Sequence, residues 1–139
     1  MNKSALSLIT FLGACGLVLA ACASAGTQAG LAGTSWKLVS YGPAGTPAAP
    51  GIDTNLDFAT DGTVNGNMGC NSFGGNFEVK NDTIVFSQVI STMMACQGPQ
   101  MMQEGTAFKV MNGTVHFQIS GKMMTIRAAS GDSVIVLSK

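Results

Sequence analysis

The chain has 139 residues, and its seven basic and seven acidic side chains give a formal net charge of zero at pH 7. This length corresponds to one domain plus a targeting segment. A chain without a basic excess lacks both the electrostatic footprint of a nucleic-acid-binding protein and the polybasic cluster that attaches proteins to anionic membranes. We therefore expect no nucleic-acid partner. Charged residues make up only 10% of the chain, which is low for a free globular protein.

The N-terminal segment has the organisation of an export signal. Lys3 supplies a positive charge, residues 5–19 are almost continuously apolar, and small residues precede Cys22. This pattern is typical of a secretory signal peptide, and the apolar stretch is shorter than the roughly 20 residues that span a bilayer. We predict that residues 1–21 form the signal peptide.

The sequence "LAAC" at positions 19–22 resembles the lipobox of bacterial lipoproteins, in which the cysteine is acylated and becomes the mature N-terminus. The resemblance implies that Cys22 is the lipidation site and that the chain attaches to a membrane through this anchor. Cys15 is a second candidate, although cleavage there would leave a very short apolar region. An ordinary cleaved signal with a free Cys22 is a third reading, disfavoured because secreted proteins rarely keep a lone thiol. Since Ala23 rather than Asp follows Cys22, similarity to Gram-negative lipoproteins implies an outer-membrane protein facing the periplasm.

Residues 22–30 are small and polar enough to form a flexible tether, and the folded domain is predicted over residues 31–139. The first predicted strand covers residues 34–41. Its alternation places Trp36 and Leu38 on one face. The opposite face of the strand is predicted to carry Lys37, Val39 and Tyr41.

The rest of the domain is predicted to be mostly short strands. Residues 42–54 carry three of the four prolines and are predicted to be a loop. Segments rich in β-forming residues then alternate with turns marked by Gly, Asn or Asp: "NLDF", "TVNGNMGC", "GNFEVK", "TIVFSQVI", "TVHFQI", "MMTIRAA" and "SVIVLS". The pattern predicts a mainly-β (α+β) fold, a curved antiparallel sheet or partly open barrel of seven to eight strands.

One segment has helical spacing instead. Residues 99–111 begin with proline, precede Asn-Gly, and place Met101, Phe108 and Met111 near one face. Gly105 lowers the intrinsic stability of this helix by about 1 kcal/mol relative to alanine. We therefore predict a single helix that depends on packing against the sheet.

Cys70 lies in the glycine-rich stretch "NMGCNSFGGNF". Whether this cysteine is a nucleophile, a metal or redox thiol, or half of a disulfide decides whether the protein is an enzyme. A cysteine nucleophile needs a base close by. The single histidine, His116, alternates with apolar residues in "TVHFQI" and is expected to face solvent. The acidic residues are scattered along the chain and form no pair that would support acid–base catalysis. We assign no catalytic residue and predict that the protein is not an enzyme.

A metal or redox role for the sulfur atoms is the alternative hypothesis. The sequence has too few ligands for a zinc site, whereas Cu(I) takes thiolate and thioether ligands. The cysteines Cys70 and Cys96 lie near several methionines in the sequence, namely Met93, Met94, Met101 and Met102. Adjacent methionines in a strand point to opposite faces, which weakens this reading. A periplasmic Cu(I)-binding or thiol-redox protein is therefore kept as the alternative, and no metal or cofactor is assigned.

The third interpretation of Cys70 is a structural bond. Beyond the anchor, the exported chain would have two cysteines, Cys70 and Cys96, in an oxidising compartment. A disulfide between them would stabilise a small domain by about 3 kcal/mol in the chain-entropy model. We favour this bond, with the surrounding glycines allowing the tight turn that it needs.

The stretches "GNMGCNSFGGNFEVKNDTIVF" and "STMMACQGPQMMQEGTAF", after the opening "LAGTSWKLVSY", resemble the META/HslJ-like family. The shared pattern is Leu-x-Gly-x-x-Trp-x-Leu, a small residue before Cys-Asn-x-Phe-x-Gly, Thr-x-Met-x-Cys, and an acidic residue on the following helix. Besides the two cysteines, the matching positions include Trp36, Gly69, Asn71, Phe73, Gly75, Thr92, Met94 and Glu104. Ser72 stands where many relatives have arginine, so a partner contact made by that arginine would be absent here.

The resemblance implies a barrel-like sheet with one helix, frequent export as a lipoprotein, a link to heat-shock and other stress responses, and no established enzymatic activity. We therefore expect a non-enzymatic, monomeric envelope lipoprotein that binds a protein partner or a hydrophobic ligand in a groove between helix and sheet. Adjacent methionine pairs are the candidate groove residues, because methionine surfaces adapt to varied partners: Met101, Met102, Met123 and Met124. The competing reading is that these methionines belong to the core.

Overall fold

The computed structural model of the protein describes residues 28–139. The predicted signal peptide, the predicted lipidation site Cys22 and tether residues 22–27 lie outside this range. Within it, no helix has the length and apolar character that a membrane-spanning helix requires. The described part opens with the short helix α1 (Gln28–Leu31), and the side chain of Leu31 is fully buried.

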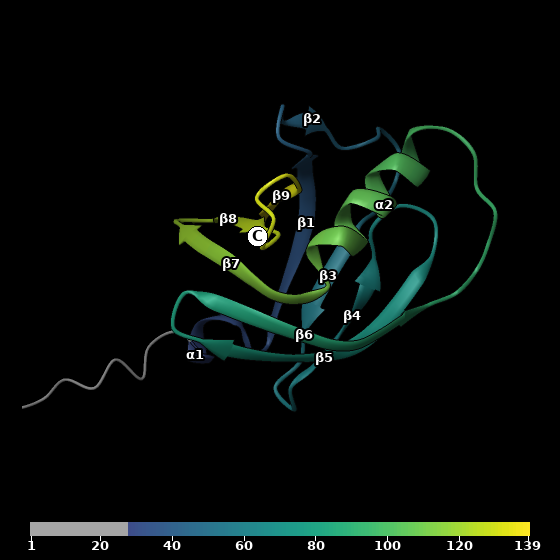
Figure 1. Ribbon diagram of the computed structural model, residues 1–139. Coiled ribbons are helices and arrows are strands. Elements are labelled where there is room, and N and C mark those ends of the chain that lie inside the picture. The colour runs from purple at the N-terminus through teal and green to yellow at the C-terminus, as the bar shows by residue number, and fades with distance from the viewer. Residues whose placement is uncertain (1–27) are drawn as a thin grey trace, which may run out of the picture.

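A closed antiparallel barrel forms the body of the molecule (Figure 1). The strands of the described part are β1 (Thr34–Tyr41), β2 (Thr46–Pro47), β3 (Asn55–Phe58), β4 (Thr63–Asn67), β5 (Ser72–Lys80), β6 (Thr83–Ser91), β7 (Gly113–Ser120), β8 (Met123–Arg127) and β9 (Val134–Ser138). Strands β1 and β3 to β9 pair in chain order, and β9 pairs back to β1. The prediction of a mainly-β barrel is confirmed.

The loop predicted over residues 42–54 contains a small addition to the barrel. The two-residue strand β2 pairs with the end of β1, opposite Ser40 and Tyr41. Pro47 lies in this strand, where a residue that cannot donate a hydrogen bond is tolerated because β2 is an outer edge. The loop prediction therefore missed an edge strand.

The face assignment of the first strand is correct except at Tyr41. Trp36 and Leu38 are buried and Lys37 and Val39 are exposed, as predicted, but Tyr41 is also buried. The pairing of β1 with β9 shifts register between Leu38 and Ser40. Because a shift of one residue exchanges the faces of a strand, Tyr41 turns into the core.

Helix α2 (Pro99–Val110) packs against β9 and β1 (Figure 1), and its bounds agree with the prediction over residues 99–111 to within one residue. The predicted buried face is wrong in part, because Met101 is exposed and Phe108 is only half-buried, although Met111 is buried. The residues of α2 that are buried are Gln103, Glu104, Ala107 and Val110. The buried face of this helix therefore combines the hydrogen-bonding side chains of Gln103 and Glu104 with the apolar side chains of Ala107 and Val110.

Aromatic side chains dominate the centre of the core. Trp36 and Phe58 are almost fully buried, and the rings of Phe58 and Phe77 meet edge to face with centroids 4.8 Å apart. The indole N–H of Trp36 donates a 2.7 Å hydrogen bond to Oγ1 of Thr34, so burial of the ring leaves no unpaired donor.

Gly66 lies where two strands of the barrel approach each other closely. It lies in β4 opposite Leu56 of β3, and a Cβ atom at this position would lie only 1.9 Å from the carbonyl oxygen of Asn55. That contact involves backbone atoms on both sides, so a side-chain rotation cannot relieve it.

We expect Gly66→Ala to lower the free energy of unfolding by about 1–3 kcal/mol, because the β3–β4 pairing must open to admit the methyl group. Gly74→Ala is the matched control, since the nearest atom to its Cβ would be 4.0 Å away. Urea unfolding followed by tryptophan fluorescence measures both variants. Equal stability of the two variants would contradict this account of β3–β4 contact.

Candidate functional site

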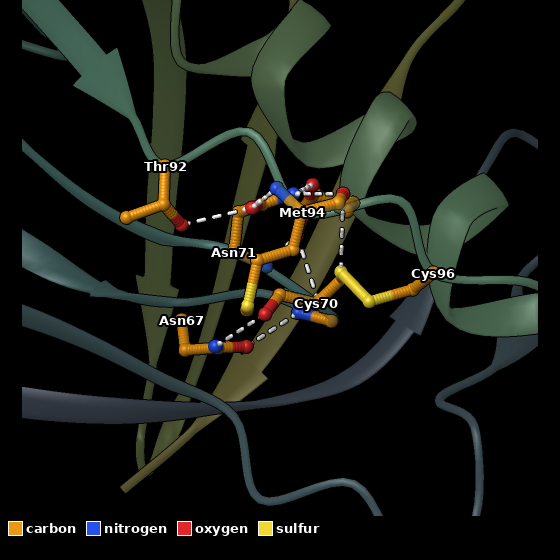
Figure 2. Close-up of a disulfide and its surroundings, with 8 residues drawn as sticks. Asn67, Cys70, Asn71, Thr92, Met94 and Cys96 are labelled. Carbon is orange, nitrogen blue, oxygen red and sulfur yellow. Dashed lines mark hydrogen bonds between the residues drawn. A yellow bond between two sulfur atoms is a disulfide. The ribbon is translucent and has the colours of Figure 1, made fainter.

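The glycine-rich stretch around Cys70 forms a buried turn between β4 and β5. Met68, Cys70 and Asn71 in this turn are all buried. Cys70 forms a disulfide with Cys96, at a Cα–Cα distance of 6.1 Å, which links the turn to the segment that leads into α2 (Figure 2). The disulfide prediction is confirmed. Because both sulfur atoms are joined, neither is available as a nucleophilic or metal-binding thiolate, so this geometry gives no support to the copper alternative.

Glu104 anchors the turn from the helix side. Its Oε2 atom accepts hydrogen bonds from the backbone N–H groups of Cys70, at 2.7 Å, and Asn71, at 2.5 Å. Its Oε1 atom accepts a third, 2.7 Å bond from the side-chain amide of Asn71. Both carboxylate oxygens therefore act as hydrogen-bond acceptors. Glu104 therefore supplies the partners that this buried backbone cannot find in a strand.

Asn71 extends the same network to the end of β6 (Figure 2). Its Oδ1 atom accepts bonds from the hydroxyl of Thr92 at 2.8 Å and from the backbone N–H of Met94 at 2.7 Å. Its amide nitrogen donates to Glu104 and, at 3.4 Å, to the carbonyl oxygen of Met94. The orientation of the Asn71 amide is thus fixed from both sides.

Gln103, the neighbour of Glu104, makes a second pair of buried contacts that the sequence analysis missed. Its carbonyl oxygen accepts a 2.7 Å bond from the backbone N–H of Ala49, and its amide nitrogen donates at 2.7 Å to the carbonyl oxygen of Met68. A glutamine beside an acidic residue carries no distinctive spacing, so no sequence signal could have identified this role.

The polar cluster formed by Asn71, Thr92, Gln103 and Glu104 is internally satisfied. Within residues 28–139, no buried side-chain nitrogen or oxygen lacks a hydrogen-bond partner. A largely buried network whose members have partners stabilises one arrangement of the chain.

Two motif glycines allow close packing next to this polar cluster. A Cβ at Gly69 would lie 2.4 Å from the carbonyl oxygen of Gln100 in α2. A Cβ at Gly75 would lie 3.0 Å from the Cα atom of Val89, opposite the bulge in β6. Both glycines therefore allow neighbouring backbone segments to come close, as expected for a residue without a Cβ atom. Trp36 and Phe73, two further motif positions, lie in the core.

His116 faces solvent on β7, as predicted, with a side-chain exposure of 66%. Its Nδ1 atom lies 3.4 Å from a carboxylate oxygen of Asp82, which is also exposed. In the described residues, no group of three or more His, Cys, Asp or Glu side chains is placed to hold a metal ion.

A hollow that we call the groove lies between β6 and the C-terminal end of α2. Strand β6 pairs with β7 only from Thr83 to Phe86, although β6 continues to Ser91. The groove has a volume of about 460 Å³ and is lined by Phe86, Ser87, Gln88, Val89, Ile90, Ser91, Phe108, Met111 and Asn112. A second cavity of about 640 Å³ shares part of β6 and is lined by Ser72, Phe73, Gly74, Gly75, Asn76, Gln88, Ile90, Ser91 and Thr92.

The predicted groove methionines are not among the residues that line these two cavities. Met124 is fully buried in the core, so its assignment to a groove is wrong: its position on β8 turns it toward the barrel interior. Met101, Met102 and Met123 are exposed, with Met102 at 69%. The neighbouring Met93 and Met94 are exposed too. Met124 thus fits the competing core reading, whereas the three exposed methionines lie outside the two cavities, because helix rotation and strand register decide which side chains reach a cavity.

We expect Glu104→Gln to lower the free energy of unfolding by about 1–3 kcal/mol, since the new amide would set its N–H₂ group against a donor of the turn. Asn71 cannot compensate by rotating its amide, because its Oδ1 already accepts two bonds. Thermal and urea unfolding measure the change. The control is Glu78→Gln, at an exposed carboxylate that pairs with Lys80, and this variant should stay within about 0.5 kcal/mol of the parent protein. Equal stability of the two variants would show that the turn does not depend on Glu104.

Comparison with known proteins places these features in a family. The META domain family matches residues 29–139. No curated protein matches the chain. Solved structures share the fold, among them the following three. The first is a protein solved by NMR, with 18% identity and a TM-score of 0.66 over 81% of this chain and 93% of that one.

The second is a protein from Burkholderia xenovorans solved by NMR, with 21% identity and a TM-score of 0.64 over 99% of this chain and 95% of that one. The third is the crystal structure of a DUF4847 family protein from Bacteroides vulgatus, with 14% identity and a TM-score of 0.58 over 81% of this chain and 96% of that one. The family match covers the whole barrel, the disulfide and the Glu104 network. The chain therefore belongs to the META domain family.

Proposed function

We propose that this META domain is a non-enzymatic binding module of the cell envelope, and that its partner protein or hydrophobic ligand occupies the groove between β6 and α2. The observation that carries the proposal is the groove itself, whose volume of about 460 Å³ lies within the range of roughly 300–1,000 Å³ that ligand sites have. It differs from the methionine groove that the sequence suggested.

The lining of the groove is mixed, and its accessible surface is more polar than apolar. Val89 and Phe108 contribute half-buried apolar side chains, Phe86 and Met111 are almost fully buried, and none of the nine lining residues is ionisable. Such a surface has neither a charged group to polarise a substrate nor an acid–base pair to move a proton. The groove is therefore better suited to binding than to catalysis.

The proposed location is the periplasmic face of the outer membrane, with Cys22 as the lipid anchor. The disulfide agrees with an oxidising compartment. Helix α1, where the described chain begins, contacts β5 and lies near the β5–β6 turn, whereas the second half of β6 runs toward the other side of the barrel (Figure 1). A tether entering at α1 would leave the groove accessible. The family resemblance supports a role in envelope stress.

Photo-crosslinking in cells that express the protein tests the groove directly. A crosslinking amino acid at Asn112, which is exposed and lines the groove, should give a specific adduct or a covalently attached lipid. The matched control is the same amino acid at Thr114, which is also exposed but lines neither of the two cavities. Equal adduct yields at both positions, or no adduct at Asn112, would exclude the groove as the binding site.

The intact mass of the mature protein, extracted from membranes under acid quench with and without a thiol-alkylating reagent, tests the anchor. We expect a chain that begins at Cys22, carries an addition of diacylglycerol size and takes up no alkylating reagent. Two alkylated thiols would show that Cys70 and Cys96 are reduced in the cell. A chain without the lipid addition would exclude the proposed anchoring.

A further inference from the structure

The second half of β6 presents an open edge, by which we mean the side of Ser87–Ser91 that faces away from β5. Strand β7 pairs with β6 only up to Phe86, where its own first residue, Gly113, lies opposite. Beyond Phe86 the C-terminal end of α2, rather than β7, lies beside β6, and the groove separates α2 from β6. In the described residues no strand lies beside this edge.

The hydrogen bond at the end of the strand shows which backbone groups face the groove. The N–H of Thr92 donates to the carbonyl oxygen of Ser72 on β5, at 3.0 Å. In an antiparallel pair, successive residues alternate between groups that point toward the partner strand and groups that point away. Ser91 pairs with Phe73 in the next position, so its N–H and C=O point away from β5 and toward the open edge.

The open edge lacks most of the features that keep exposed strands from pairing. Edge strands are usually protected by Lys, Pro, inward charges or bulges. Ser87–Ser91 contains neither charge nor proline, and Ile90 is 76% exposed. The bulge opposite Gly75 is one such feature; it takes up Gln88 and Val89, and beyond it Ile90 and Ser91 pair regularly with β5.

The surroundings of the open edge determine the charge of the segment that fits. Neither of the two cavities that adjoin it is lined by an ionisable residue. A charged side chain placed there would lose water without gaining an ion pair, which is unfavourable. Hydroxyl and amide groups at Ser87, Gln88, Ser91 and Asn112 complement neutral polar and apolar side chains.

The geometry points to strand addition: the open edge binds an uncharged, extended segment of a partner protein, whose backbone pairs with β6 while its alternate side chains enter the groove. This inference rests on the proposed function and specifies its ligand class. Backbone pairing supplies affinity in such complexes and the pockets supply specificity. A second copy of this chain fits less well. In each copy the open edge lies beside the end of α2, so two edges that are each flanked by a helix would have to pair.

A displayed library of random segments of about eight residues, selected on the disulfide-bonded domain, provides the probe. We expect enrichment of uncharged sequences with alternating apolar side chains. The most enriched peptide is then synthesised and titrated against the parent protein, Ser91→Ala and Ser91→Pro. Proline removes the N–H that faces the open edge without touching the β5 ladder, so Ser91→Pro should bind about five- to tenfold more weakly than Ser91→Ala, which has lost the same hydroxyl but keeps the N–H. Thermal unfolding verifies that both variants are folded.

A peptide N-methylated at alternate residues tests the same contact from the ligand side and needs no protein variant. It should bind at least about tenfold more weakly than its parent, because it loses the donors that pair with β6. Equal binding of the N-methylated peptide, or no enrichment from the library while Asn112 still gives its specific adduct, would overturn strand addition and leave the groove as a binding site of another kind. No enrichment and no adduct would overturn both proposals. A concentration-dependent dimer that Ser91→Pro abolishes would assign the open edge to a second copy and overturn the peptide proposal.

Discussion

The contact between the Glu104 carboxylate and the turn at Cys70–Asn71 is the constraint on which the rest of the structure depends. Hydrogen bonds to charged groups contribute about 1.5–3 kcal/mol each, more than bonds between neutral groups. Here one carboxylate receives two backbone N–H groups and a side-chain amide. The contact fixes the rotation of α2 relative to the barrel, which in turn places Phe108 and Met111 opposite β6. The groove, which is lined by both polar and apolar side chains, therefore follows from a buried polar interaction.

The disulfide and the polar cluster stabilise the same junction by different means. The Cys70–Cys96 bond closes a loop with a sequence separation of 26 and restricts the unfolded chain, a gain of about 3 kcal/mol in the entropic model. The hydrogen bonds of Glu104 and Asn71 act in the folded state, where they specify direction as well as distance. A disulfide alone would tolerate several orientations of α2, whereas the network of Asn71 accepts only one.

The open edge is a consequence of how α2 enters the barrel. The helix is inserted in the chain between β6 and β7, and the two strands share pairs only from Thr83 to Phe86. A barrel without this insertion could pair β6 along its whole length and leave no edge. The arrangement instead leaves a strand whose backbone is half-satisfied, next to a cavity of about 460 Å³. Such a site combines backbone hydrogen bonding with side-chain pockets, the two elements of peptide recognition by strand addition.

The sequence by itself determined the elements of this protein. Alternating β-forming segments with glycine turns predicted the strands, Pro99 and Asn112-Gly113 bounded the helix, and an even cysteine pair predicted the disulfide. These features depend on local spacing and on composition, which the sequence states directly. Only the tertiary structure decided which face of each strand and helix is buried. A register shift in β1 turned Tyr41 inward, and the position of β8 placed Met124 in the core. Contacts of Gln103 and Glu104 helped to set the rotation of α2. Each of these outcomes depends on contacts between residues far apart in the chain, such as Ala49 with Gln103, and periodicity within one segment carries no information about them.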